Sequence, residues 1–110
     1  MQFYGKVAVI TGAASGIGRA TSIAMTDLGI EAIAAVDRSA AVADMCDTFN
    51  REVGRQVLFP YSGDVTNEEF RQSVFSDLRH RFGVVHICIP AAGITRDRLA
   101  VKYHKNNGNR

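Results

Sequence analysis

The stretch Thr11-Gly12-Ala13-Ala14-Ser15-Gly16-Ile17-Gly18 places three glycines at the spacing G-x-x-x-G-x-G, directly after a short apolar run. That run is Val7-Ala8-Val9-Ile10, and a continuous apolar run of this length is typical of a strand buried on both faces. From Ile17 onward the pattern becomes helical, and Gly29 is the expected C-terminal stop. The stretch therefore predicts a tight turn that joins a buried strand to a helix.

Glycine is expected at each of these three positions for a different physical reason. Gly12 permits the tight turn, Gly16 lets a phosphate ligand approach the backbone, and Gly18 lets the helix pack closely on the strand. The helix then offers unpaired N–H groups and the positive end of its dipole, which favour phosphate. The alternative is a merely glycine-rich turn, and the acidic residue after the next strand argues against it.

That acidic residue is Asp37, which lies 19 positions after Gly18. The distance is close to the roughly 20 residues expected for a carboxylate that binds the adenosine ribose of a dinucleotide. A carboxylate accepts hydrogen bonds from ribose hydroxyls and repels a 2′-phosphate, so we expect NAD in preference to NADP. Arg38 weakens this preference, because an arginine can bind a 2′-phosphate; a solvated surface charge is the alternative for Arg38, and a simple helix cap the alternative for Asp37.

The rest of the chain continues to alternate strands with helices. Further apolar runs predict strands at 32–36, 57–59 and 84–89. Ser39 is the expected cap of a second helix that Gly54 ends, and Thr66 with Glu69 forms the expected capping box of a third. The expected inward-facing residues of the three helices are, in order, Ala20, Ala24 and Leu28; Val42, Met45, Cys46, Phe49 and Val53; and Phe70, Val74, Leu78 and Phe82.

This alternation predicts an α/β fold with a parallel sheet and helices on both faces. Four strands and three helices suit the strand order 3-2-1-4, which is the first half of a Rossmann-type doubly wound sheet. Such sheets bind ligands at the carboxyl ends of the strands. We expect residues 5–94 to form an NAD-binding half-domain and residues 95–110 to form a basic polar tail.

With these residues in place, the sequence resembles the short-chain dehydrogenase/reductase family. Thr11, Gly12, Gly16 and Gly18 match the family's T-G-x-x-x-G-x-G motif, and Asp64-Val65 matches its acidic pair that contacts the adenine ring. The family's N-N-A-G after strand four aligns with Pro90-Ala91-Ala92-Gly93, where both asparagines are replaced. The resemblance covers residues 5 to about 95. With the residue types of the glycine turn, it implies the following cofactor-binding residues: Thr11, Gly12, Ser15, Gly16, Ile17, Gly18, Asp37, Arg38, Asp64, Val65, Ala91, Ala92 and Gly93.

The resemblance also implies the reaction, a hydride transfer between a nicotinamide dinucleotide and an alcohol or carbonyl carbon, carried by a Tyr-x-x-x-Lys pair. No tyrosine of this chain has a lysine four positions later; Tyr103 has Asn107 there. We therefore expect no catalytic residue in these 110 residues. The chain is expected to be inactive alone, with its small-molecule substrate bound only by a complete protein. A non-catalytic nucleotide-binding half-Rossmann module is the alternative.

Composition narrows the remaining function classes. Residues 1–95 hold eight Lys or Arg and ten Asp or Glu, whereas residues 96–110 hold five and one. The basic end leaves nucleic-acid binding open, but a solvated loop is the favoured interpretation, since no aromatic interleaving accompanies the charge. Cys46 and Cys88 lie in apolar patterns and are expected to be reduced core residues of a cytoplasmic protein. No metal-ligand spacing, export signal or membrane-spanning run is visible, and the fourth strand is expected to be an apolar edge through which the chain associates with itself.

Overall fold

The computed structural model describes residues 3–91, which form one twisted sheet covered by helices on both faces. The order of elements along the chain is β1 (Val7–Thr11), α1 (Gly16–Asp27), β2 (Ala32–Asp37), α2 (Ala41–Val53), β3 (Leu58–Ser62), α3 (Glu68–Phe82) and β4 (Ile87–Pro90). The strand order is β3-β2-β1-β4 and every pair is parallel, which confirms the predicted half of a Rossmann-type sheet.

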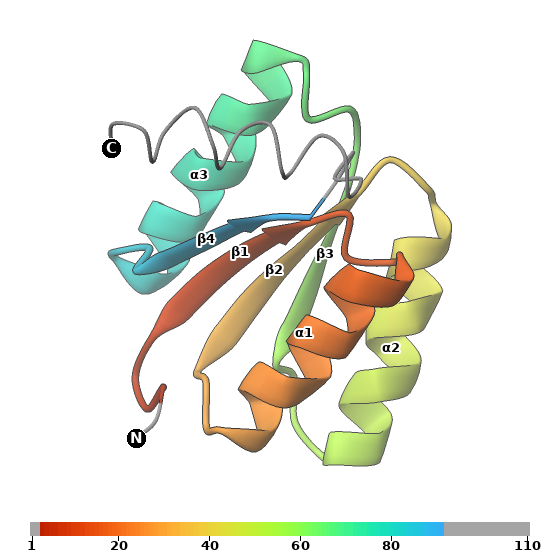
Figure 1. The fold of residues 1–110 in the computed structure, drawn as a ribbon. Coiled ribbons are helices and arrows are strands. Elements are labelled where there is room, and N and C mark those ends of the chain that lie inside the picture. The colour runs from red at the N-terminus through yellow and green to blue at the C-terminus, as the bar shows by residue number, and fades with distance from the viewer. Residues whose placement is uncertain (1–2, 92–110) are drawn as a thin grey trace, which may run out of the picture.

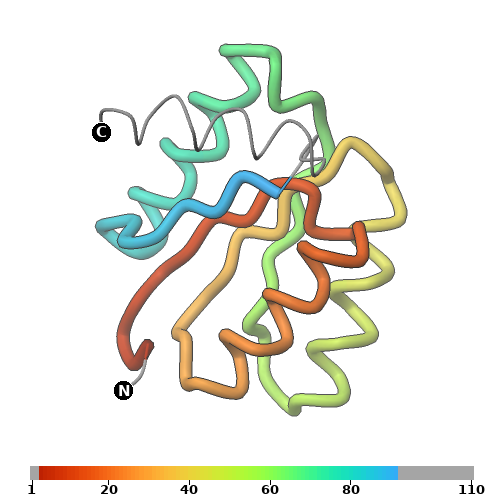
Figure 2. Tube along the Cα trace, in the orientation of Figure 1, coloured from red at the N-terminus to blue at the C-terminus, as the bar shows by residue number. Residues whose placement is uncertain are grey.

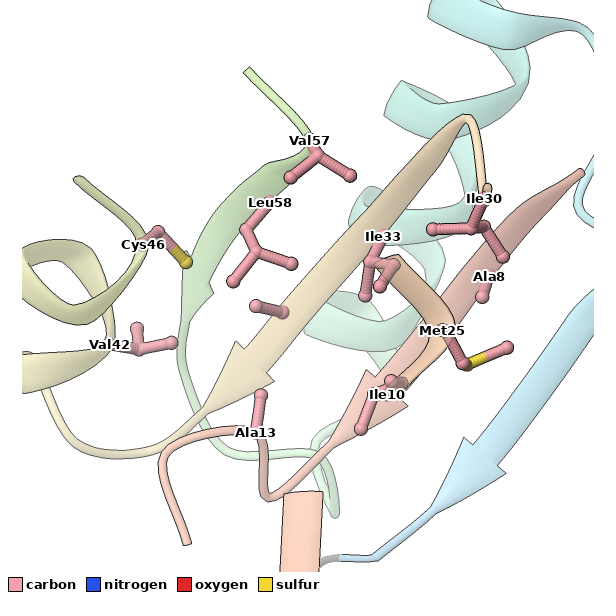
Figure 3. Packing of buried hydrophobic residues seen from close by; sticks show 11 residues of the cluster. Ala8, Ile10, Ala13, Met25, Ile30, Ile33, Val42, Cys46, Val57 and Leu58 are labelled. Atoms are coloured by element: carbon pink, nitrogen blue, oxygen red, sulfur yellow. The ribbon is translucent and has the colours of Figure 1, made fainter. Parts of the chain in front are cut away.

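The helices divide between the two faces of the sheet (Figure 1). Helices α1 and α2 cover one face, over a buried cluster that includes Ile10, Ile33 and Leu58 from three neighbouring strands. Figure 3 shows Val42 and Cys46 of α2 beside Leu58 in this cluster. Helix α3 covers the opposite face, where Val74 and Leu78 pack with Val9, Ala34 and Val36. Because both faces are covered, the two central strands β1 and β2 are almost entirely buried, as their apolar runs predicted.

Helix α1 turns a different face to the sheet from the one that its apolar periodicity predicted. Ala20, Ala24 and Leu28 are exposed, and the buried residues are Gly18, Ser22 and Met25. The prediction was wrong because the bare backbone of Gly18 packs against the Gly12 backbone, so the helix face that carries Gly18 is turned to the sheet. Ser22 is buried without cost to its hydroxyl, which donates to the Gly18 carbonyl at 2.9 Å.

Two predicted helix starts also need correction. Helix α3 is capped by Asn67, whose side chain accepts from the Phe70 N–H at 2.8 Å, and not by a Thr66–Glu69 box. Thr66 is engaged by Asp64 instead. Helix α2 begins after Ala40, which makes no side-chain cap; the Ser39 hydroxyl still accepts from the Ala41 N–H at 3.1 Å. Gly54 ends α2 in the left-handed conformation, as predicted.

Strand β4 is shorter and more exposed than its sequence predicted. It begins at Ile87 rather than at residue 84, and Cys88 is exposed instead of buried in a core. Cys88 pairs with Val9, so it lies on the face that α3 covers. A shallow groove lined by Phe75, Arg79 and residues 83–88 remains open there. Val53, expected inside, is likewise exposed, because it occupies the last turn of α2.

The packing of α3 on β3 includes one polar contact between a tyrosine and an aspartate, which titrate at opposite ends of the pH scale. The Tyr61 hydroxyl donates to the Asp77 carboxylate at 2.5 Å, and the Arg81 guanidinium donates to the same oxygen at 3.1 Å. Burial, reinforced by the Asp77 contact, raises the pKa of Tyr61 to about 12. The hydrogen bond from Tyr61 in turn lowers the pKa of Asp77.

We predict a pH-dependent stability difference between the wild-type chain and a Tyr61→Phe variant. The raised tyrosine pKa stabilises the fold below pH 10, and this contribution is lost as the pH rises through about 12. The lowered Asp77 pKa stabilises the fold above the usual 3.8, and this contribution is lost as the pH falls below it. Urea unfolding from acid to alkaline pH gives the free energy of unfolding of both proteins. The difference between the wild-type chain and the variant should be constant around neutral pH and should shrink at both extremes. A difference independent of pH would contradict the role of this contact.

Among the described residues, no helix is long and apolar enough to cross a membrane. The same part of the chain contains no group of three or more acidic, histidine or cysteine side chains arranged to hold a metal ion.

Candidate functional site

The strand register brings the predicted site residues to one edge of the sheet. Thr11 lies opposite Val36 in β2 and opposite Pro90 in β4, and Asp37 lies opposite Ser62 in β3. The residues that follow each strand therefore meet at the carboxyl ends, where the tube in Figure 2 shows the three strand-to-helix connections close together. Ala91 lies at this edge and is buried, whereas Ala92 and Gly93 lie outside the described residues.

The glycine turn between β1 and α1 has the close backbone packing that its spacing predicted. Gly12 has a φ of 69°, a conformation that glycine adopts without strain. A Cβ on Gly18 would lie 2.2 Å from the Gly12 carbonyl oxygen, so the helix start and the strand end touch through bare backbone. A Cβ on Gly16 would meet no atom of the described residues within 4 Å. The packing of the protein itself therefore requires glycine at position 18 but not at position 16.

Ser15 holds the start of α1 in place. Its hydroxyl donates to the Gly12 carbonyl at 2.6 Å and accepts from the Gly18 N–H at 3.2 Å. Within residues 3–91, the N–H groups of Gly16 and Ile17 donate to no protein acceptor. Ile17 is also 61% exposed. Among the described residues, the first turn of α1 thus has two N–H groups without an acceptor at an exposed surface, which is the arrangement that binds phosphate oxygens.

Asp37 connects the end of β2 to the glycine turn. One carboxylate oxygen accepts from the Ala14 N–H and the other from the Ser39 N–H, both at 2.9 Å. It does not cap α2, which was the alternative considered for it, since the helix begins at Ala41. The half-buried carboxylate is oriented by these two backbone donors beside the turn.

The end of β3 contributes Asp64 and Val65. One Asp64 oxygen accepts from the Thr66 N–H at 2.9 Å and from the Thr66 hydroxyl at 2.8 Å, and the other lies 3.6 Å from the Arg38 guanidinium. The hydrogen bonds from Thr66 lower the pKa of Asp64. The Val65 carbonyl accepts from the Arg71 guanidinium at 2.7 Å.

Thr66 and Ala14 were not among the predicted site residues. Thr66 orients Asp64 and Ala14 orients Asp37. The Asp-x-Thr spacing of residues 64–66 is the signature of an Asx turn and could have identified Thr66. Nothing local in the sequence could have identified Ala14, because only its backbone N–H takes part.

The sequence model described as short chain dehydrogenase matches residues 6–109, nearly the whole chain. The chain belongs to the short-chain dehydrogenase family. The family match runs through the segment that we expected to be a basic tail.

Family relatives share both the sequence and the fold. The 3-oxoacyl-acyl-carrier-protein reductase of Escherichia coli K12 is 34% identical over 110 residues, which is 93% of this chain and 40% of the reductase. A short-chain dehydrogenase/reductase from Burkholderia phymatum in complex with NAD is 36% identical, with a TM-score of 0.70 over 80% of this chain and 31% of that one. The L-sorbose reductase of Gluconobacter frateurii, complexed with NADPH and L-sorbose, is 30% identical, with a TM-score of 0.76 over 86% of this chain and 35% of the reductase.

The chain spans less than half the length of the curated family members that it matches. The two solved family members above bind different nicotinamide dinucleotides, one NAD and the other NADPH. Membership of the short-chain dehydrogenase family therefore leaves the choice of cofactor to the residues of this chain.

Proposed function

We propose that the carboxyl edge of the sheet binds a nicotinamide dinucleotide, with the pyrophosphate at the first turn of α1 and the adenosine ribose at Asp37. The observation that carries the proposal is the contact between Asp37 and the Ala14 N–H, beside a Gly16 that has open space in front of it. A ribose carboxylate and a phosphate-binding turn are thereby held next to each other. Val65 and Ala91 would complete the adenosine side of the site, together with Ala92 and Gly93.

We further propose that NAD is preferred to NADP. Asp37 already has both oxygens directed by backbone donors, so its negative charge is held in one place at the ribose. A carboxylate there accepts hydrogen bonds from ribose hydroxyls and repels the two negative charges of a 2′-phosphate. The bound dinucleotide supplies hydride chemistry in this family; the role proposed for these residues is to bind and orient it.

The complete protein is proposed to be an oxidoreductase that acts on an alcohol or carbonyl compound. The 110-residue chain is proposed to bind the dinucleotide without turning over substrate, since no Tyr-x-x-x-Lys pair is present in it. A cytoplasmic location stays a prediction of the sequence.

Titration of the chain with NADH and with NADPH, followed by nicotinamide fluorescence, tests this function directly. We expect saturable binding of both, with NADH the tighter ligand. Asp27→Asn is a suitable control, because it removes an exposed carboxylate at the far end of α1 and should leave both affinities unchanged. Equal, non-saturable signals from both dinucleotides would show that this edge is not a dinucleotide site.

We also propose that the chain associates with itself through β4, which is an edge strand of the sheet that the described residues form and carries an exposed Cys88. Light scattering under reducing conditions should then give a mass above 12.0 kDa. Cys88→Lys should restore the monomer mass, because a charged side chain on an edge strand opposes pairing. A wild-type chain that is monomeric at high concentration would refute this association.

A further inference from the structure

An ion pair spans the ends of β2 and β3 at the proposed adenosine site. The Arg38 guanidinium lies 3.6 Å from an Asp64 carboxylate oxygen, and the two side chains are 77% and 47% exposed. Among the described residues, Asp64 is the carboxylate that forms an ion pair with Arg38. An exposed pair of this kind contributes little to the stability of the fold. Its importance is that it places a second carboxylate beside the arginine that follows Asp37.

The surrounding hydrogen bonds keep Asp64 in this position. Its other oxygen accepts from both the N–H and the hydroxyl of Thr66, so the carboxylate cannot rotate freely. These bonds also favour the charged form of Asp64 and lower its pKa. Asp37, by contrast, directs its two oxygens to Ala14 and Ser39. Asp64 is therefore the carboxylate that has an oxygen available to pair with Arg38.

We propose that Asp64 sets the preference for NAD by neutralising Arg38, the cation best placed to bind a 2′-phosphate. This inference rests on the proposed function. A guanidinium near the ribose is the usual partner of the 2′-phosphate of NADP, through charge-assisted hydrogen bonds. With Asp37, Arg38 and Asp64 all charged, the local sum is −1 and a phosphate is repelled. Without the Asp64 charge, Arg38 offsets Asp37 and its donors are released.

The test compares Asp64→Asn with the wild-type chain by the ratio of NADPH to NADH affinity. Asparagine keeps the shape of the side chain and an oxygen that Thr66 can bind, and it removes the charge. Any loss of an adenine contact affects both dinucleotides alike, because both carry adenine, and cancels in the ratio. We expect the ratio to move toward NADPH by roughly fivefold, the size of one exposed charge interaction.

The Arg38→Gln background shows whether Asp64 acts through Arg38. With no guanidinium to release, Asp64→Asn should leave the ratio unchanged there. If the ratio moves equally in both backgrounds, Asp64 repels the phosphate by its own charge and the proposed route is wrong. If Asp64→Asn changes the affinity ratio in neither background while the wild-type chain binds NADH, the inference about Asp64 is wrong and the proposed dinucleotide site is retained. If the wild-type chain binds neither dinucleotide, the proposed function itself fails, and the inference with it.

Discussion

Replacing Gly18 with alanine is expected to unfold the chain, whereas the same replacement at Gly16 leaves it folded and weakens dinucleotide binding. At position 18 the new Cβ would lie 2.2 Å from the Gly12 carbonyl oxygen and 2.8 Å from the Ala13 Cα. Both neighbours are backbone atoms, so β1 and α1 would have to separate. We expect a loss of at least about 3 kcal/mol in the free energy of unfolding, the upper end of the cost of overpacking.

Gly16→Ala is the matched control for this prediction. No atom of residues 3–91 lies within 4 Å of the new Cβ, and alanine is the better residue in a helix, so stability should be unchanged or rise by up to about 1 kcal/mol. The methyl group would occupy the space proposed for the pyrophosphate. We expect NADH affinity to fall roughly 10- to 100-fold, corresponding to the cost of one steric overlap in a packed site.

Thermal unfolding followed by circular dichroism, together with NADH titration, separates the two glycines. A Gly18→Ala chain that melts with the wild type would show that the close approach to Gly12 is not needed. A Gly16→Ala chain that keeps full NADH affinity would place the phosphates elsewhere.

Asp37→Asn is expected to weaken NADH binding by roughly 10- to 100-fold, because it removes the charge from one or two hydrogen bonds to the ribose. NADPH binding should weaken less or become stronger, so the preference for NADH over NADPH should become smaller. The variant should also lose about 1–2 kcal/mol of stability. The reason is that the amide cannot accept from both the Ala14 and Ser39 N–H groups.

Ser39→Ala provides the control for Asp37. It removes the hydroxyl that accepts from the Ala41 N–H and keeps the backbone N–H that donates to Asp37. Its NADH affinity should therefore equal that of the wild-type chain. Fluorescence titration at a temperature where all variants are folded gives the comparison. An Asp37→Asn chain with unchanged affinity for both dinucleotides would remove Asp37 from the proposed site.

The sequence and the structure agree where the determining forces are local. Continuous apolar runs such as Val7-Ala8-Val9-Ile10 mark strands buried on both faces, and the structure confirms both central strands. Gly29 and Gly54 follow helix ends with positive φ, a requirement that a short stretch of sequence expresses by itself. The alternation of strands with helices then left few topologies, and the strand order 3-2-1-4 is among the simplest.

They disagree where a residue's surroundings come from distant parts of the chain. Ala20, Ala24 and Leu28 have the right spacing for a buried face, but Gly18 packs against the Gly12 backbone, and Ser22 faces inward with it instead. Cys88 has apolar neighbours in sequence, yet it lies on an edge strand of the described sheet, in a groove beside α3 that leaves it exposed. Apolar periodicity carries no information on either point, because it records which residues can be buried and not which are.

For the candidate site, the sequence by itself determined the residue types and their order: the glycine turn, an acidic residue after the second strand and another after the third. These follow from backbone sterics and from the carboxyl-end rule for parallel sheets. Only the tertiary structure decided that Asp37 is held by Ala14 and that Arg38 is paired with Asp64. Both contacts join residues more than 20 positions apart in the sequence. Their geometry depends on the register of three strands that meet only when the sheet has formed.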